Sequence, residues 1–305
     1  MSEAGASGTK IAVIGLGSMG YGIAGSLARR GFQVVGYDVR AETLAQFARE
    51  HGTAAATPAA AAKEAQIIVI VVVNSDQTGE ALFNKSGVVE TAGRGAVVVS
   101  CATMAPGRAR QLALEVENHG LLYLDAPISG GTQRAAEGAL TVLASGSPAA
   151  FAKARPVLDA MAAKVYDLGE EPGIGASFKI VNQLLAGVHI AAACEAIALA
   201  SRLGLDLARV YEVIAASAGN SWMFENRVPH ILAGDYAARS AVDIFTKDLG
   251  IVADISRSEK FPTPVASSAL QMFLMTAAAG MGRDDDASVA RLYAMIAGLK
   301  LPGVE

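Results

Sequence analysis

The stretch KIAVIGLGSMGYGIAGSLARR, residues 10–30, decides the fold of this chain of 305 residues. The apolar, β-branched run at its start predicts a buried strand, and the alanine-rich segment from Tyr21 onward predicts a helix. The six residues that join them, GLGSMG (15–20), follow the pattern G-x-G-x-x-G. In a strand–turn–helix unit these glycines permit a tight turn, a close approach of the backbone to a pyrophosphate, and close packing of the helix. The stretch therefore predicts a βαβ unit that binds a dinucleotide.

A carboxylate further along the chain supports the same prediction independently. Asp38 ends the next β-rich run, QVVGYD (33–38). It lies about 20 residues after the glycines, where an acidic side chain accepts hydrogen bonds from the adenosine ribose. This carboxylate would repel a 2′-phosphate and so favours NAD over NADP, but Arg40 weakens the preference because an arginine can pair with that phosphate. The alternative, a tight turn that binds nothing, is disfavoured by Asp38.

The residues expected to contact this cofactor lie in the glycine-rich turn and at the carboxyl ends of strands, where ligands bind in open α/β sheets. Three of them, Val73, Asn74 and Thr103, are explained equally well as turn residues. The full set is Gly15, Leu16, Gly17, Ser18, Met19, Gly20, Asp38, Val73, Asn74 and Thr103.

Short β-rich runs alternate with alanine-rich helical stretches through the first half of the chain. This alternation is typical of a parallel sheet covered by helices on both faces, and it predicts a Rossmann domain over residues 1–170. An apolar stretch with helical spacing, residues 177–202, is expected to join it to an all-helical substrate and dimerisation domain, residues 171–305. The predicted strands are 10–15, 33–38, 66–72, 96–100, 121–126, 139–144 and 164–168, and the tract 53–65 is expected to be a loop followed by a short surface helix.

Composition and charge exclude several classes of protein. The formal net charge of -4 provides no basic surface for nucleic acid, and two cysteines cannot form a disulfide framework. The four histidines show no ligand spacing, so no metal site is expected. The most apolar run, IIVIVVV (67–73), is too short to cross a membrane, and the small polar residues 1–10 do not resemble a secretory signal. We therefore expect a cytoplasmic protein without a transmembrane helix.

A glycine pair follows the fifth β-rich run, in the segment DAPISGG (125–131). Ser129, Gly130 and Gly131 would expose consecutive amides and a hydroxyl at a strand end, which suit the carboxylate of a substrate. An ordinary flexible turn explains the same residues equally well.

One lysine lies among small and apolar residues in the segment GIGASFKIVNQ (173–183). On a helix, Lys179, Asn182 and Gln183 share one face. Burial and the positive helix N-terminus would both disfavour the ammonium form of Lys179, so it could accept a proton from a substrate hydroxyl. Gly173 and Gly175 would let a cofactor or substrate lie against the backbone. The alternative is a lysine whose stem covers apolar surface while its amine reaches water.

Four motifs together resemble the β-hydroxyacid dehydrogenase family over essentially the whole chain. They are GLGSMG (15–20), DAPISGG (125–131), GIGASFKIVNQ (173–183) and KDLGIVAD (247–254), in this order. The resemblance implies that Lys179 is the catalytic lysine and that Ser129 to Gly131 bind the substrate carboxylate. It also implies that Lys247, with Asp248, contributes a second cofactor and substrate motif from the helical domain, and that the protein is a homodimer or homotetramer.

The chain departs from the family at one position. Many members carry an asparagine four residues after the catalytic lysine, whereas this chain has Gln183, preceded by Asn182. Glutamine offers the same donor and acceptor groups on a longer stem, so either residue is a candidate for the substrate hydroxyl. Trp222 and Phe224 are typical of a helix core, but the resemblance makes them candidates for walls of the substrate site.

The function that the resemblance implies is NAD-dependent oxidation of a small hydroxy acid. The run through NSWMFENRVPH (220–230) is most similar to members that act on L-threonate. The alternatives are oxidation of 3-hydroxyisobutyrate, reduction of tartronate semialdehyde, and a nucleotide-binding sensor or scaffold without turnover. Imine reduction is disfavoured, because relatives with that activity usually lack the lysine.

Overall fold

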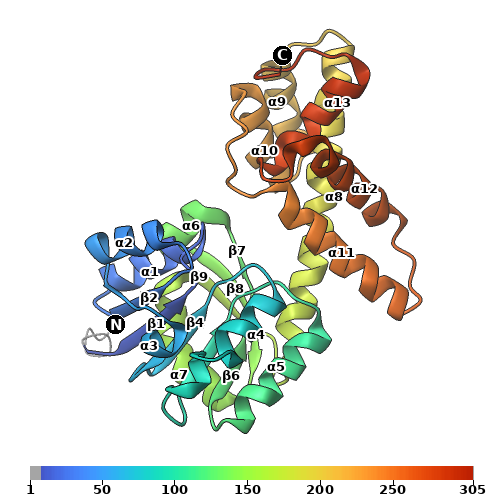
Figure 1. Ribbon diagram of the computed structural model, residues 1–305. Coiled ribbons are helices and arrows are strands. Elements are labelled where there is room, and N and C mark those ends of the chain that lie inside the picture. The colour runs from blue at the N-terminus through green and yellow to red at the C-terminus, as the bar shows by residue number, and fades with distance from the viewer. Residues whose placement is uncertain (1–7, 305) are drawn as a thin grey trace. The chain divides into compact units, whose positions relative to one another are not determined.

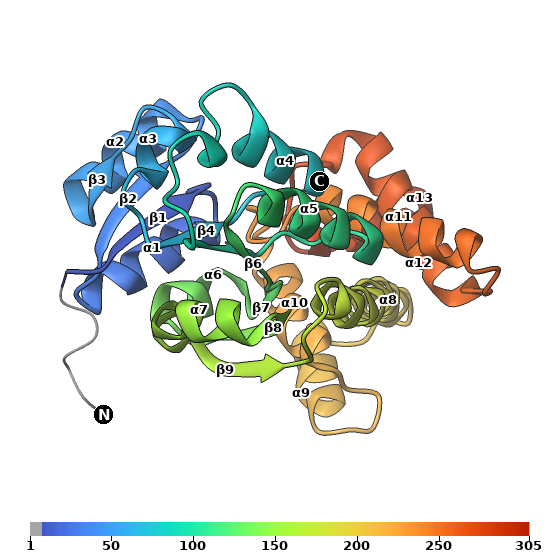
Figure 2. The same cartoon turned by 90° about the horizontal axis from the view of Figure 1, so that it is seen from below.

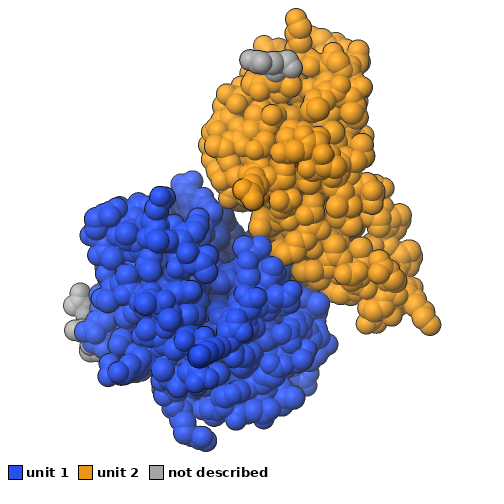
Figure 3. All heavy atoms as spheres, in the orientation of Figure 1, with its two compact units in different colours: residues 1–179 blue, residues 180–305 orange. Residues whose placement is uncertain are grey.

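The computed structural model of the protein describes residues 8–304. The polar segment expected before the first strand lies, up to residue 7, outside the described residues. The chain divides into two compact units, unit 1 up to Lys179 and unit 2 from Ile180 onward (Figure 3).

Unit 1 is built on one nine-stranded sheet (Figure 1). The strand order is β3-β2-β1-β4-β5-β6-β8-β7, with β9 paired to β8, and its first six strands follow the Rossmann order. The pairs from β3 to β6 are parallel. The strands are β1 (Lys10–Ile14), β2 (Gln33–Tyr37), β3 (Thr53–Ala54), β4 (Ile67–Ile70), β5 (Val97–Ser100), β6 (Leu122–Asp125), β7 (Ile128–Ser129), β8 (Leu140–Gly146) and β9 (Ala162–Asp167).

The central strands are mostly apolar because both faces of the sheet are buried, and their polar residues, Lys10, Ser100 and Asp125, lie at strand ends. In β1, Ile11 and Val13 enter one apolar core, while Ala12 and Ile14 enter the other. Helices α1, α2, α6 and α7 contribute to the first core and α3, α4 and α5 to the second. In Figure 2, α4 and α5 lie on one side of the central strands and α6 and α7 on the other. Their bounds are α1 (Gly20–Arg29), α2 (Ala41–Glu50), α3 (Pro58–Ala62), α4 (Ser75–Phe83), α5 (Pro106–Asn118), α6 (Gly131–Glu137) and α7 (Pro148–Met161), with a short 3-10 helix η2 (Val88–Glu90).

Two details of unit 1 correct the expectation from the sequence. The sheet is not wholly parallel, because β8 runs antiparallel to both β6 and β7. The chain leaves β6, makes the two-residue β7 and the short α6, and then returns along β8. The tract 53–65 contains β3, and its helix α3 is not a surface helix, since three of its alanines, Ala59, Ala61 and Ala62, are buried.

Unit 2 is helical, as expected. Its core joins the apolar face of α8 to the helices that follow, with Phe245, Leu249 and Phe273 among its large buried side chains. Arg227 of α10 forms a buried ion pair with Asp286, which ties α10 to the segment before the last helix. The helices are α8 (Ile174–Arg202), α9 (Leu207–Ala215), α10 (Trp222–Ala233), α11 (Val242–Ser258), α12 (Pro264–Thr276) and α13 (Val289–Ala297), with η3 (Ala277–Met281) and η4 (Asp286–Ser288).

Helix α8 begins three residues earlier than the sequence predicted and continues across the division between the units. The sequence placed the domain boundary after residue 170, whereas the contacts divide the chain after Lys179. The difference arises because the first turn of α8 is hydrogen-bonded to strands of unit 1.

The sequence pointed to the run 67–73 as the most apolar stretch, but the longest apolar element is helix α8. In the described part of the chain it is the one helix whose length and composition would allow it to cross a membrane, and half of its most apolar window is buried inside the protein. Buried core helices of soluble proteins have the same length and composition.

Candidate active site

The three glycines of the turn between β1 and α1 have different surroundings. A Cβ on Gly15, which has a φ of +92°, would lie 2.3 Å from the carbonyl oxygen of Val71. A Cβ on Gly20 would lie 1.9 Å from the carbonyl oxygen of Gly15. A Cβ on Gly17 would meet nothing closer than the Arg40 guanidinium at 3.9 Å. Gly15 and Gly20 are therefore required by the protein's own packing, whereas the backbone at Gly17 faces open space that a ligand can enter.

The amino end of α1 has no side-chain cap that would compete with an anion. The residue before the helix, Met19, makes no capping hydrogen bond with its side chain, and the first turn carries no acidic residue. The positive end of the helix dipole favours a phosphate group at this position.

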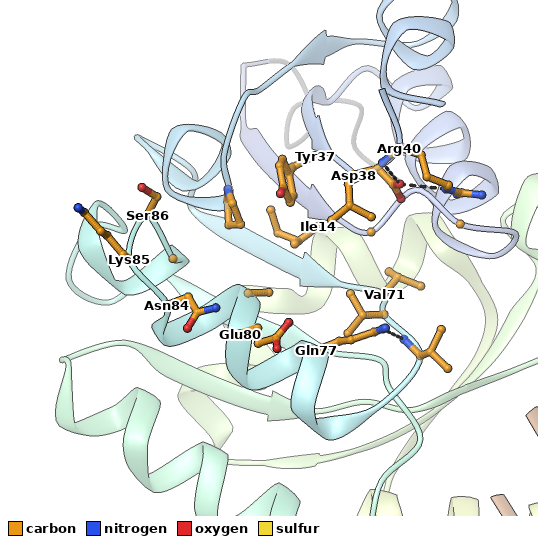
Figure 4. A pocket seen from close by; sticks show the side chains of 18 of the residues that line it. Ile14, Tyr37, Asp38, Arg40, Val71, Gln77, Glu80, Asn84, Lys85 and Ser86 are labelled. Atoms are coloured by element: carbon orange, nitrogen blue, oxygen red, sulfur yellow. Dashed lines mark hydrogen bonds and ion pairs between the residues drawn. The ribbon is translucent and has the colours of Figure 1, made fainter. Parts of the chain in front are cut away.

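Asp38 lies at the end of β2 beside this turn and is held by three donors (Figure 4). Its carboxylate accepts hydrogen bonds from the amide of Leu16 at 2.7 Å, the amide of Arg40 at 2.9 Å and Nε of Arg40 at 3.1 Å. Burial raises the pKa of this carboxyl, but the bonds from Arg40 and Leu16 outweigh burial and lower the pKa below its ordinary value. Asp38 is therefore anionic at neutral pH and repels a 2′-phosphate, while Arg40 partly neutralises it.

A cavity of about 580 Å³ opens between the glycine-rich turn, the end of β2 and helix α4 (Figure 4). Five of the ten residues predicted from the turn and strand ends line it: Gly15, Gly17, Ser18, Asp38 and Val73. Its residues fit the adenosine and pyrophosphate part of a dinucleotide. They combine open backbone at Gly17, a helix without a side-chain cap, and the carboxylate of Asp38 directly after β2.

The other predicted cofactor residues have different places. Leu16 is buried and contributes its amide to Asp38, and Asn74 caps α4 by accepting a hydrogen bond from the amide of Gln77. Met19, Gly20 and Thr103 do not line the cavity. The sequence missed lining residues that follow β2 and β4 or come from α4 and its end; their closeness to the predicted strand ends was the available signal. They include Tyr37, Val39, Val71, Val72, Gln77, Glu80, Asn84, Lys85 and Ser86. Arg40, which the sequence named for its effect on the choice of cofactor, also lines the cavity.

The segment of Ser129, Gly130 and Gly131 joins β7 to α6. Ser129 pairs with Thr141 at the end of β7. Gly130 and Gly131 have φ angles of 138° and 78°, which side-chain-bearing residues rarely adopt. A Cβ on Gly131 would meet nothing within 4 Å, so this backbone also faces open space.

Lys179 lies in the second turn of α8 and is buried, with 7% of its surface exposed. The sequence predicted that Gly173 and Gly175 leave room for a cofactor or substrate. In the structure, the protein's own backbone occupies the space beside both glycines. A Cβ on Gly175 would lie 2.4 Å from the carbonyl oxygen of Leu143, and one on Gly173 would lie 2.8 Å from that of Pro106. Both glycines let the start of α8 approach the protein's own backbone.

A buried carboxylate that the sequence did not single out lies at this helix end. Asp125, the last residue of β6, accepts hydrogen bonds from the amides of Gly173 and Ala176, each at 2.8 Å. Burial raises the pKa of Asp125 to about 6, although these two bonds and one with Ser145 act in the opposite direction. Asp125 opens the segment DAPISGG, so the family motif was the signal that could have found it.

Within unit 2, four predicted or implied residues form one hydrogen-bonded chain. Asn182 donates to the side-chain oxygen of Gln183 at 2.9 Å, Gln183 donates to Asp248, and Lys247 donates to the other oxygen of Asp248. Gln183 and Asp248 are buried. The chain therefore ties α8 to α11 and fixes the amide of Gln183 with its nitrogen toward Asp248.

The two aromatic candidates of α10 differ in their environment. Trp222 is 49% exposed, whereas Phe224 is 4% exposed in the core of unit 2 and stacks on Tyr211. Phe224 is therefore packed in the helix core, which was one of the two environments expected from the sequence.

Among the described residues 8–304, no group of three His, Cys, Asp or Glu could hold a metal ion. The two cysteines, Cys101 and Cys194, are free and buried.

Comparison with known proteins covers both units. A family model of the NAD binding domain of 6-phosphogluconate dehydrogenase matches residues 10–169, and a model of the NAD-binding region of NADP-dependent 3-hydroxyisobutyrate dehydrogenase matches residues 173–293. An L-threonate dehydrogenase of Cupriavidus necator is 50% identical over 96% of this chain and 98% of its own length. One from Escherichia coli K12 is 45% identical over 97% of both chains. A crystal structure from Salmonella typhimurium, described as 3-hydroxyisobutyrate dehydrogenase, matches with a TM-score of 0.89 at 46% identity, covering 93% of this chain and 99% of that one.

Proposed function

Because the chain belongs to the β-hydroxyacid dehydrogenase family, we propose that it oxidises L-threonate to the corresponding 2-oxo acid with NAD as hydride acceptor. The family relationship makes the protein an NAD-dependent dehydrogenase. L-Threonate is favoured because two relatives named for that substrate are 45% and 50% identical over nearly the whole chain. The Salmonella protein of comparable identity is described by a different substrate, so 3-hydroxyisobutyrate is the second candidate.

The observation that carries the proposed chemistry is the burial of Lys179 at the start of α8. An amine in this position lies out of bulk water, where it can exchange a proton directly with a bound hydroxyl. In the proposed reaction this base takes the proton of the substrate hydroxyl while the hydrogen on the same carbon leaves as hydride. Bound NAD supplies the electrophilic ring that receives the hydride. The carbonyl that forms keeps the oxygen of the hydroxyl, so one hydride and one proton leave in total.

The remaining site residues are proposed to bind different groups of the substrate and cofactor. We assign the carboxylate of the hydroxy acid to Ser129, Gly130 and Gly131. The positive φ of the two glycines and the open space at Gly131 support this role. The hydroxyls are assigned to Asn182 and Gln183, with Trp222 as an apolar wall, and Lys247 is assigned to the cofactor. Because Gln183 is already bonded to Asn182 and Asp248, Asn182 is the one whose side-chain oxygen is left for a substrate hydroxyl.

A substrate and cofactor panel tests this proposal. Purified protein is assayed with L-threonate, D-threonate, L-erythronate and 3-hydroxyisobutyrate, each with NAD and with NADP. We expect kcat/KM for L-threonate with NAD to exceed that for 3-hydroxyisobutyrate by at least tenfold, since hydroxyls matched by buried polar groups discriminate strongly against analogues that lack them. We also expect NADP to be the poorer acceptor, because Asp38 is anionic. Equal or better turnover of 3-hydroxyisobutyrate would remove the L-threonate assignment and leave the family assignment intact.

We also infer that the protein is a cytoplasmic homo-oligomer. Apolar side chains along α8, including Val181, Leu185 and Leu199, are 49% to 62% exposed, and a second copy of the chain would cover them. Sedimentation should therefore give a multiple of the 31.2 kDa chain mass, and a mass of one chain at micromolar concentration would refute the oligomer. The free thiols of Cys101 and Cys194 are compatible with a reducing compartment.

A further inference from the structure

The amino end of α8 is capped from outside the helix. Gly173, the residue before the helix, has no side chain to cap it. Asp125 of β6 accepts hydrogen bonds from the amides of Gly173 and Ala176 at 2.8 Å, and Ser145 of β8 accepts one from the amide of Gly175 at 2.9 Å. Three amides of the helix entry and first turn, which would otherwise lack partners, are thus bonded to the ends of two neighbouring strands.

This arrangement differs from that of the five described α-helices that have a side-chain cap of their own. Each of α3, α4, α7, α9 and α10 is capped by the side chain of the residue just before it. Such a local cap stabilises a helix without fixing its place in the fold. The bonds to Asp125 join residues 48 and 51 positions apart, so they attach α8 to the sheet as well as capping it.

Close packing also holds the amino end of α8 in place against the sheet. The backbone at Gly175 is so near to β8 that a Cβ would lie 2.4 Å from the carbonyl oxygen of Leu143 and 2.9 Å from that of Asp125. Ala176 is buried in the core of unit 1. Asp125 itself is 1% exposed, so its charge is held in the interior by hydrogen bonds rather than by water.

Lys179 follows this fixed turn directly. It lies three residues after Ala176, about 4.5 Å further along the helix axis. Because a helix is stiff over one turn, a shift or rotation of the first turn would move Lys179 by nearly the same amount. We propose that Asp125, with Ser145, is a positioning residue for Lys179: its bonds to the first turn of α8 set where the amine lies relative to the strand ends. This inference rests on the catalytic role proposed above for Lys179.

The test begins with Asp125→Ala in the full-length protein, assayed with NAD and L-threonate. We expect kcat to fall about 100-fold, the cost of misplacing a catalytic group by about 1 Å. The Kd for NAD, measured by fluorescence titration, should stay within threefold, since Asp125 does not line the nucleotide cavity. Asp125→Asn keeps an oxygen that can accept both amides, so it should recover at least tenfold of the lost kcat. A merely structural role would lower kcat, NAD affinity and thermal stability together.

Asp206→Ala is the matched control. Asp206 caps α9 by accepting two amides, at 2.9 and 3.1 Å, and its removal should lower thermal stability without changing kcat. If Asp125→Ala does not fold, Ser145→Ala decides instead, because it removes one of the three bonds and should lower kcat about tenfold. The inference is wrong if the folded Asp125→Ala, or Ser145→Ala in its place, keeps kcat within threefold of the unaltered protein.

A double-mutant cycle separates this inference from the proposed function. In a Lys179→Ala background, adding Asp125→Ala should lower the residual rate no further, because Asp125 acts through the lysine. A second full 100-fold loss would show that Asp125 acts independently, and the inference would fail. A Lys179→Ala protein with undiminished kcat would instead refute the proposed function, whatever Asp125→Ala does.

Discussion

Lys179→Ala is expected to lower kcat for hydroxy-acid oxidation about 1000-fold, within the range of 10²–10⁴ that general acid–base catalysis contributes. The physical reason is that no other base is proposed to take the hydroxyl proton as the hydride leaves. NAD affinity should be unchanged, since Lys179 does not line the nucleotide cavity. Steady-state rates of NADH formation, together with a fluorescence titration of NAD, measure both quantities on one preparation.

Lys153→Ala is a suitable control for this substitution. Lys153 also lies on a helix of unit 1, α7, but its side chain is exposed, so its removal should leave kcat unaltered. Lys179→Arg keeps a positive charge but cannot release its proton at neutral pH, and should be nearly as inactive as the alanine variant. A Lys179→Ala protein that oxidises the hydroxy acid normally would leave the nucleotide-binding sensor as the better interpretation of the fold.

Gly20→Ala is expected to have the largest effect on the nucleotide site. The added Cβ would lie 1.9 Å from the carbonyl oxygen of Gly15, a backbone atom that cannot rotate away. Either the glycine-rich turn or the start of α1 must shift. We expect the Kd for NAD to rise at least tenfold and the free energy of unfolding to fall by about 1–3 kcal/mol, as for other overpacked sites. Isothermal titration with NAD and urea unfolding measure the two changes.

Gly107→Ala provides the matched control, because Gly107 also lies in the first turn of a helix. It is the second residue of α5, and a Cβ there would meet nothing within 4 Å. This variant should be as stable as the unaltered protein or more stable by up to about 1 kcal/mol, through its better helix propensity. Gly20→Ala that binds NAD with unchanged affinity would show that the glycine-rich turn tolerates the shift, and that close packing at this glycine is not needed for binding.

The main strands and the Rossmann order were predictable because their sequences carry the physical requirement directly. A strand buried on both faces must be largely apolar, as β4 (IIVI) and the first three residues of β5 (VVVS) are. The strands β3 and β7 were missed since two residues are too few to form a pattern. The direction of β8 could not be predicted, because it depends on how the chain returns after α6 rather than on the composition of the strand.

The site was predictable where a residue's role is local and not where it depends on distant contacts. Gly15, Gly17 and Asp38 are recognisable from spacing because they serve one turn and one strand end. The reason for Gly175 was mistaken, since the atoms that exclude its Cβ belong to Leu143 and Asp125. The contacts of Asp125 are 48 and 51 residues away in the sequence, so no local pattern identifies it as a helix cap.

The most direct test of the account is a crystal structure of the protein with NADH and a hydroxy acid that it turns over. We expect Nζ of Lys179 to lie at hydrogen-bonding distance, about 2.6–3.2 Å, from the hydroxyl on the carbon that faces the nicotinamide. A complex in which that amine projects into bulk water, with another side chain bonded to the reacting hydroxyl, would contradict it.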